Sequence, residues 1–209
     1  MTAAPPDVQR RILAAAERLF GEFGIDAVSL RQIAAAAGQR NTSAVAYHFG
    51  GKHGLVAAIY AWRMADVNAR RLRLLDELHR TGGDGDVARL VAALVDPLAE
   101  TLEGRGEPGS YLRFMAETMR NPRYDPAATA AAHPHADSIR LLTARLRAAL
   151  PGLPDSVFAE RLRLASMLMV TALADREHLL QEPDSHSRPF VGLPALRSAC
   201  WAILTGPAA

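Results

Sequence analysis

The chain has 209 residues, of which 49% are hydrophobic and 22% are charged, and its formal net charge is +2. This composition is typical of a globular, water-soluble chain that can bury a substantial core in one large domain or two smaller ones. Because the net charge is small, it excludes a general basic field as the source of affinity for a polyanion, and any such affinity must come from a local arrangement of charges.

The sequence also bears on the cellular compartment. Its one cysteine, Cys200, cannot form an intramolecular disulfide, and the N-terminal residues lack the apolar stretch of a secretory signal. We find no apolar run long enough to span a bilayer. We therefore expect a cytoplasmic protein that does not associate with a membrane.

The first two predicted helices are marked by apolar periodicity and by residues at their ends. Apolar residues recur at three- and four-residue steps from Asp7 to Phe23, and Gly24 follows as a stop. Ser29 offers a hydroxyl as the cap of a short helix from Leu30 to Ala37, and Gly38 suits the left-handed turn at its end.

A third short helix follows at once. Asn41 can cap the segment TSAVAYHF, which the glycine pair Gly50 and Gly51 terminates. Two helices joined by a tight glycine-containing turn form a helix-turn-helix, whose second helix can enter the major groove of DNA.

The rest of the chain carries the same helical period, interrupted by glycine and proline breakers. We expect helices over residues 53–80, 87–102, 111–119, 136–150, 156–180 and 194–204. No alternating β pattern or internal repeat is present. The sequence therefore predicts an all-α fold: an N-terminal three-helix helix-turn-helix domain at residues 7–53, joined by a long helix to a C-terminal helical bundle, with the second domain at residues 54–209.

The third helix has two chemically different faces. Thr42, Ser43 and Ala44 are small, so the helix backbone can approach base edges closely, with hydroxyls to donate or accept hydrogen bonds and methyl groups to touch thymine. Val45 and Phe49, four residues apart, are expected to point back onto the first two helices. One short segment thus offers a reading face and a packing face.

Phosphate donors are predicted at both ends of this motif. Tyr47, His48 and Lys52, the only lysine of the chain, lie where a helix in the groove passes the DNA backbone, and their hydroxyl, imidazole and ammonium groups can all donate to phosphate oxygens. The start of the second helix offers unpaired N–H groups and the positive end of a helix dipole to another phosphate. The candidate residues there are Ser29, Arg31 and Gln32.

These residues resemble the DNA-binding domain of the TetR family of transcriptional repressors. The resemblance rests on Phe20, Gly24, VSLRQIAAAAG and YHFGGKHGL, in the order and spacing of the family, over roughly residues 8 to 56. It implies a homodimer that binds a palindromic operator in double-stranded DNA, associates with the nucleoid, and lets go when a small-molecule effector, not identified by the resemblance, occupies the C-terminal domain.

The segment departs from the usual family pattern in three places. The turn and third helix are one residue longer, with Arg40 where an apolar residue is common and Asn41 as the cap, so the base contacts fall within Arg40, Asn41, Thr42 and Ser43. Ser29 stands where threonine is frequent, and either hydroxyl can cap. His53 and Gly54 replace acidic or polar residues, a change that we expect to be neutral.

In the C-terminal region, the segment AERLRLASMLMVTALAD is apolar around most of its helical circumference, which indicates burial on several sides. The family resemblance suggests that the helices around 157–181 and 195–204 pair with their copies across a two-fold axis. An ordinary monomer core is the alternative, which periodicity does not distinguish.

Two further side-chain groups have the chemistry of ligand or DNA binding. Tyr111, Met115 and Met119 form a stripe of the kind that lines adaptable apolar pockets, and we treat them as candidate ligand-binding residues, although such a stripe is more often core. Arg70, Arg71 and Arg73 are expected to form a solvated face that does not contact DNA.

A second class of protein was weighed: a helical small-molecule- or metal-binding protein without DNA-binding function. His133 and His135 flank a proline, and none of the seven histidines forms an i, i+4 pair with a carboxylate base. We find no phosphate loop and no activated nucleophile, so we expect no metal, no cofactor and no enzymatic activity. Cys200, beside Trp201, is expected to be a small buried hydrophobe, with a redox role as the alternative.

Overall fold

The computed structural model describes residues 7–39, 43–103, 109–124, 136–181 and 191–207, and every regular element in these ranges is a helix. The all-α fold is thereby confirmed. The three N-terminal helices are α1 (Asp7–Phe23), α2 (Leu30–Ala36) and α3 (Ser43–Phe49). They agree with the predicted ranges to within a residue at each end, which is the usual uncertainty of helix boundaries.

The remaining elements also follow the predicted order. They are α4 (Lys52–Arg80), α5 (Val87–Ala99), the 3₁₀ turn η1 (Glu100–Glu103), α6 (Tyr111–Arg120), η2 (Pro122–Tyr124), α8 (Asp137–Ala149), α9 (Asp155–Gln181) and α10 (Leu193–Thr205). The predicted helix over 87–102 is therefore an α-helix that tightens into a 3₁₀ turn at its end.

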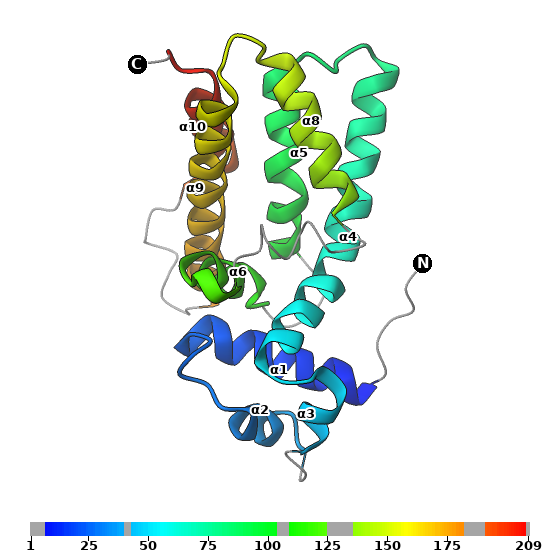
Figure 1. Ribbon diagram of the computed structural model, residues 1–209, viewed down its shortest axis with the longest axis vertical. Coiled ribbons are helices and arrows are strands. Elements are labelled where there is room, and N and C mark those ends of the chain that lie inside the picture. The colour runs from blue at the N-terminus through cyan, green and yellow to red at the C-terminus, as the bar shows by residue number, and fades with distance from the viewer. Residues whose placement is uncertain (1–6, 40–42, 104–108, 125–135, 182–190, 208–209) are drawn as a thin grey trace.

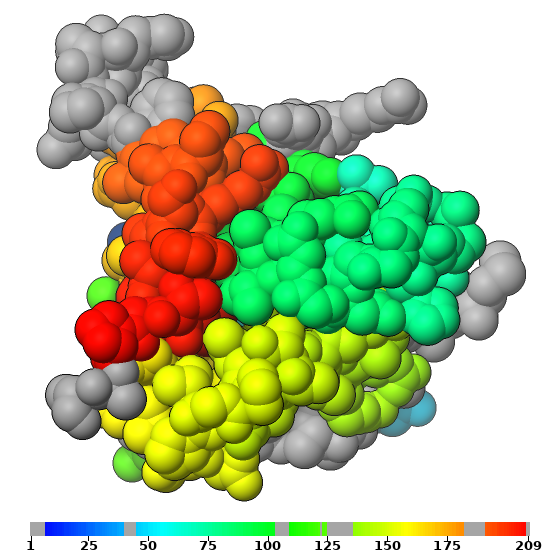
Figure 2. Space-filling model, turned by 90° about the horizontal axis from the view of Figure 1, so that it is seen from above, coloured from blue at the N-terminus to red at the C-terminus, as the bar shows by residue number. Residues whose placement is uncertain are grey.

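The helices form two layers of unequal size along the long axis (Figure 1). Helices α1, α2 and α3 lie together at one end, and the 29 residues of α4 lead from them into a bundle with α5, α8, α9 and α10. Helix α6 lies between the two parts and packs on both α1 and α9. At the far end of the bundle α5 packs against both α10 and α8 (Figure 2).

The turns between the first helices depend on glycine. Gly24, Gly38, Gly50 and Gly51 all have positive φ, between 68° and 116°, a backbone conformation that other residues adopt at a steric cost. Gly38 ends α2 and Gly50 follows α3, as the sequence predicted. The three turns that hold these glycines reverse the chain tightly enough for α1, α2, α3 and the start of α4 to pack against one another.

Helix α5 contains a proline, and this has a consequence elsewhere in the bundle. Pro97 has no N–H, so the carbonyl of Ala93, four residues earlier, lacks its usual partner within the helix. Arg71 of α4 takes that place: its Nε donates to the Ala93 oxygen at 3.1 Å, and only 1% of the residue is exposed. The prediction of a solvated arginine face is therefore wrong for Arg71, although it holds for exposed Arg73.

Candidate nucleic-acid interface

Helix α2 begins with a capping box. The Ser29 hydroxyl accepts a hydrogen bond from the backbone N–H of Gln32 at 3.2 Å, and the Gln32 side-chain oxygen accepts one from the Ser29 N–H at 2.8 Å. The predicted cap is confirmed. Because these groups satisfy each other, the exposed Arg31 and the side-chain NH₂ of Gln32 are the donors left at this helix start.

Helix α3 has the packing face that the sequence predicts. Val45 is fully buried in the core, and Phe49 is half-buried against it. On the other side Tyr47 is 86% exposed and His48 is also exposed, with the two rings in edge contact at 5.4 Å. Helix α3 is therefore anchored by its apolar side chains and presents polar aromatic groups to solvent at the end of the molecule (Figure 1).

The structure says little about the residues that are predicted to read base edges. Arg40, Asn41 and Thr42 lie outside the described residues, and with them the predicted Asn41 cap and the longer turn. Ser43 and Ala44 are the first residues of α3, and their backbone belongs to the helix. Their roles stay predictions.

Lys52 is the first residue of α4, and its ammonium group already has protein partners. The Nζ atom donates to the carbonyl oxygens of Ile25 at 2.9 Å and Asp26 at 3.0 Å, in the turn between α1 and α2. An ammonium group has three N–H donors, so one remains for an outside acceptor such as a phosphate oxygen. Lys52 thus ties α4 to the three N-terminal helices, a role that the sequence did not reveal.

The prediction that Gly54 is a neutral replacement is wrong. A Cβ atom at this position would lie 1.7 Å from the carbonyl oxygen of Phe49, so only glycine lets the first turn of α4 approach the end of α3 this closely. The ring of His53 packs on Tyr124 of η2 with a centroid distance of 4.6 Å, and whether this replacement is neutral stays a prediction. Gly54 therefore fixes the end of α3 against the start of α4.

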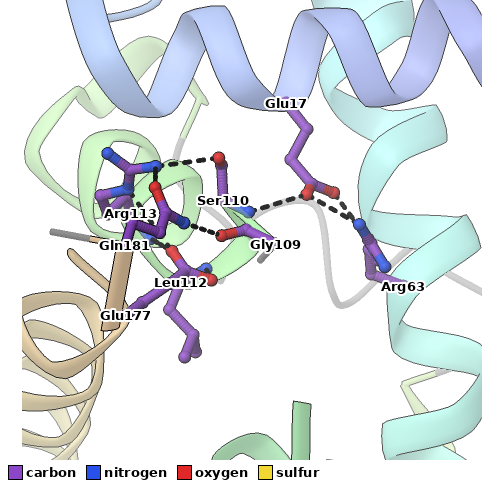
Figure 3. A network of polar contacts seen from close by, with 8 residues as sticks. All are labelled: Glu17, Arg63, Gly109, Ser110, Leu112, Arg113, Glu177 and Gln181. Carbon is purple, nitrogen blue, oxygen red and sulfur yellow. Dashed lines mark hydrogen bonds and ion pairs between the residues drawn. The ribbon is translucent and has the colours of Figure 1, made fainter. Parts of the chain in front are cut away.

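A buried ion pair joins α1 to α4. Both carboxylate oxygens of Glu17 accept hydrogen bonds from Arg63, at 2.6 and 2.8 Å, and the Glu17 side chain is only 3% exposed (Figure 3). One of the same oxygens also accepts the backbone N–H of Ser110, just before α6, at 3.3 Å. Gly21 lets α6 come close, since a Cβ there would lie 3.1 Å from the Ser110 carbonyl.

A second carboxylate holds the start of α6 to α9. Glu177 accepts the backbone N–H groups of Leu112 and Arg113, at 3.2 and 2.9 Å (Figure 3). Burial raises the pKa of Glu177 to about 7, although these two N–H groups and the nearby guanidinium of Arg113 favour the charged form. Glu17 of α1 and Glu177 of α9 therefore both accept backbone N–H groups at the start of α6, and this joins the N-terminal helices to the bundle.

The candidate ligand-binding residues on α6 lie inside the protein. Tyr111 is buried, Met115 is nearly so, and Met119 is half-buried against the same core. The stripe therefore packs as core, as the alternative interpretation held. The Tyr111 hydroxyl is nonetheless unusual, because it is buried and has no hydrogen-bond partner among the described residues.

Helices α9 and α10 each bury one face and expose an apolar one. Val170 and Leu173 of α9 are buried in the protomer, whereas other large apolar side chains of these two helices are left exposed. The exposed residues are Leu164, Met167, Leu168, Leu180 and Trp201. Leu164, Met167 and Leu168 lie at three- and four-residue steps on one side of α9, and we call them, together with Trp201 of α10, the α9–α10 apolar face. Leu180 lies on another side of α9. These exposed side chains account for the all-round apolar pattern seen in the sequence.

Within the described ranges, no group of three His, Cys, Asp or Glu side chains is arranged to hold a metal ion. Cys200 is buried, its thiol lies 3.7 Å from the Ala165 carbonyl oxygen, and burial raises its pKa, which disfavours the reactive thiolate. None of the helices in the described part of the chain combines the length and hydropathy that a bilayer crossing requires.

The fold and the site define a helix-turn-helix DNA-binding protein. A family model described as bacterial regulatory proteins of the tetR family matches residues 12–59, and one described as a tetracyclin repressor-like C-terminal domain matches residues 92–192. The chain belongs to the TetR family, and it is a DNA-binding transcriptional regulator.

Individual relatives agree with this assignment. The HTH-type transcriptional dual regulator CecR of Shigella flexneri is 40% identical over 73 residues, which are 35% of this chain and 31% of CecR. The aligned stretch thus spans less than a third of that relative. The solved structure of PfmR, a TetR family transcriptional regulator from Thermus thermophilus, aligns over 95% of this chain and 96% of its own, with a TM-score of 0.54 and 20% identity. This likeness supports the fold.

Proposed function

We propose that the protein is a homodimeric repressor that binds a palindromic operator through α3 and releases it when a small-molecule effector binds the C-terminal bundle. The observation that carries this proposal is the two-faced α3. Val45 and Phe49 hold it to the core, while Tyr47 and His48 are exposed to solvent. The helix itself lies at one end of the molecule (Figure 1). A helix presented in this way can enter a major groove.

Within this proposal the contacts divide into two kinds. Base edges are read by the residues at the start of α3 and just before it, namely Arg40, Asn41, Thr42, Ser43 and Ala44. Phosphates are held by Arg31, Gln32, Tyr47, His48 and the remaining N–H of Lys52. The predicted contribution of Ser29 is indirect, because its N–H and hydroxyl both donate to the Gln32 side-chain oxygen and orient that amide. Thr42→Ala is then expected to cost about 1 to 3 kcal/mol at one base pair, because a lost base contact is sequence-specific whereas a lost phosphate contact is not.

The α9–α10 apolar face supports the homodimer. A single short recognition helix makes too few base contacts for tight specific binding, so two copies must act on one operator. Isologous pairing would bury Leu164, Leu168 and Trp201, which the protomer leaves to solvent. A palindromic operator follows from the two-fold symmetry of such a dimer.

Release by an effector requires that the bundle move α3. Helix α4 is joined to the DNA-binding helices by Lys52 at its start and by Arg63 further along, so a rotation of α4 would carry α1, α2 and α3 with it. The two copies of α3 must lie about 34 Å apart to occupy successive major grooves, so a modest change in their separation weakens binding. Effector and operator then bind antagonistically, each lowering the affinity for the other by the same factor.

The test is selection of binding sites from a random duplex library with the purified protein, followed by affinity measurements on the best site at two salt concentrations. We expect an enriched inverted repeat, bound with a steep salt dependence because phosphate contacts release counterions. Enrichment of a single half-site would argue against the dimer. Equal affinity for every duplex, or no binding at either salt concentration, would overturn the proposal.

A further inference from the structure

Arg71 is a charged group buried in the C-terminal bundle. Its Nη1 donates to the Ser138 hydroxyl of α8 at 3.2 Å and its Nη2 to the Leu94 carbonyl of α5 at 3.4 Å, beside the Nε bond to Ala93. Burial lowers the pKa of Arg71 to about 10, so the guanidinium is still protonated at neutral pH. A guanidinium has five N–H donors, and these three bonds leave two of them without a partner among the described residues.

Neither of the other two helices around Arg71 supplies a counter-charge from the acids described there. Asp96 of α5 pairs with Arg197 at 2.7 Å, and Asp137 of α8 pairs with Arg140 at the protein surface. Glu100, which follows α5, pairs with Arg70 at 3.0 Å. Within the described residues Arg71 therefore contacts only neutral oxygens, whereas a buried charge is normally paired.

The local backbone adds to the positive potential at this point. Ser138 lies in the first turn of α8, where the helix dipole places a partial positive charge. Its N–H donates to the neutral side-chain oxygen of Asn68 at 3.0 Å, and the acid of this turn, Asp137, pairs with Arg140 at the protein surface. Pro97 explains the Nε bond to Ala93, because it frees that carbonyl. Pro97 does not explain the two longer hydrogen bonds, which Nη1 and Nη2 of Arg71 donate. These two nitrogens are a pair to which the two oxygens of a carboxylate can bind side by side.

The Tyr111 hydroxyl is the second unsatisfied group in this region. It is buried without a hydrogen-bond partner in the described part of the chain, and its pKa is raised well above the ordinary value, by burial first and then by the electrostatic influence of Tyr60 and Glu17, while Arg63 and Arg71 act in the opposite direction. The hydroxyl therefore stays protonated and can donate. A buried hydroxyl without a partner and a buried guanidinium with two free N–H groups are each costly to leave unsatisfied, and a carboxylate can accept hydrogen bonds from both.

We propose that the effector is a small organic acid with an apolar body, whose carboxylate pairs with the Nη1 and Nη2 atoms of Arg71 and accepts a hydrogen bond from Tyr111. The inference rests on the effector response proposed above and adds the chemical class of the ligand. The Nε bond to Ala93 stays in place and orients the guanidinium. The carboxylate supplies the negative charge that Arg71 lacks among the described residues.

This position also connects the ligand to the DNA-binding helices. Tyr111 is the first residue of α6, and the residue before it, Ser110, donates its N–H to Glu17 of α1. Arg63 and Arg71 are eight residues apart on α4, about 12 Å along the helix axis. A ligand that draws Arg71 and Tyr111 together therefore acts on α4 and α6, and these two helices hold Glu17 of α1 through Arg63 and Ser110.

The test is isothermal titration calorimetry of the full chain with matched pairs of probes: octanoate against octanamide, and 4-butylbenzoate against 4-butylbenzamide. We expect each acid to bind the wild type at least roughly tenfold more tightly than its amide, since a hydrogen bond to a charged group contributes that much or more. Arg71→Gln should abolish the preference. Tyr111→Phe should weaken the acids about tenfold without lowering the Tm of the ligand-free protein, because it removes a hydroxyl that has no partner in the described part of the chain.

Several results would overturn the inference: no acid of either pair binds, the amides bind as tightly as the acids, or Arg71→Gln keeps the acid preference. If Arg71→Gln fails to fold, Tyr111→Phe provides the test. An unchanged affinity of Tyr111→Phe for the acids would also overturn the inference. Operator binding separates this inference from the proposed function. Acids that bind through Arg71 but leave the operator complex intact would refute effector release alone, whereas release by an uncharged compound would refute the ligand class alone.

Discussion

The Nζ atom of Lys52 lies 2.9 Å from the carbonyl oxygen of Ile25 and donates a hydrogen bond to it, across 27 residues of sequence. This bond joins the first residue of α4 to the turn between α1 and α2. A second bond, to the Asp26 carbonyl, fixes the ammonium group at the same turn. The start of the long helix is therefore held to the DNA-binding helices by backbone acceptors, so a side-chain substitution in that turn would not remove the link.

Lys52→Ala is expected to lower the free energy of unfolding by about 1 to 3 kcal/mol, because two carbonyls lose a charged donor. It should also weaken binding to every duplex and reduce the magnitude of the salt slope by roughly one unit if the third N–H contacts a phosphate. Urea unfolding measures the first effect and operator titration at several salt concentrations the second. A stability loss with an unchanged slope would leave Lys52 as a tie between helices and remove it from the phosphate contacts.

Tyr47→Phe tests the exposed face of α3. The side chain is mostly in solvent, so we expect the free energy of unfolding to change by less than about 0.5 kcal/mol, while affinity for all duplexes falls through the loss of a phosphate donor. Val45→Ala, two residues away and fully buried, is the matched contrast and should cost about 2 kcal/mol of stability. Unchanged operator affinity in a folded Tyr47→Phe protein would remove Tyr47 from the interface.

Leu168→Glu tests the α9–α10 apolar face. Leu168 is 37% exposed, and Leu141 of α8 is 38% exposed but lies outside that face, so Leu141→Glu is a control of equal exposure. We expect Leu168→Glu to shift the mass in analytical ultracentrifugation from dimer to monomer and to abolish tight operator binding, because a buried unpaired carboxylate opposes association. A dimer that survives this change, or that Leu141→Glu disrupts equally, would place the interface elsewhere.

The helix-turn-helix was predictable because its signals are local. Ser29 precedes an apolar run and caps α2, and glycines stand where positive φ is required, so each boundary can be read within a few residues. Helical periodicity likewise separated buried Val45 from the exposed side of α3. The family resemblance, carried by the same short segment, then supplied the class of function.

The misjudged residues depend on contacts between distant parts of the chain. The burial of Arg71 follows from Pro97 and Ala93 on another helix, and a run of three arginines gives no sign of which one turns inward. Gly54 must be glycine only because the carbonyl oxygen of Phe49 would lie 1.7 Å from a Cβ atom at this position. Pro97 inside an otherwise regular helix was the one sequence signal that a carbonyl on α5 needed an outside donor.

Glu177 makes stability depend on pH. Its pKa is about 7 in the folded protein and ordinarily 4.5, mainly because of burial, so between these values the folded state holds a proton that the unfolded chain has released. This contribution to stability is complete below about pH 4.5 and is lost as the pH rises through about 7.

Glu177→Gln should therefore flatten the pH dependence of unfolding between about pH 4.5 and pH 7, since the amide carries no charge to desolvate. The measurement is the wild-type free energy of unfolding in urea minus that of the variant, at each pH, so that the histidines common to both proteins cancel. This difference should fall as the pH rises. Glu160→Gln, the same change from carboxylate to amide at an exposed position of the same helix, is the control. If Glu177→Gln gave a constant difference, the carboxylate would not be the titrating group at the start of α6.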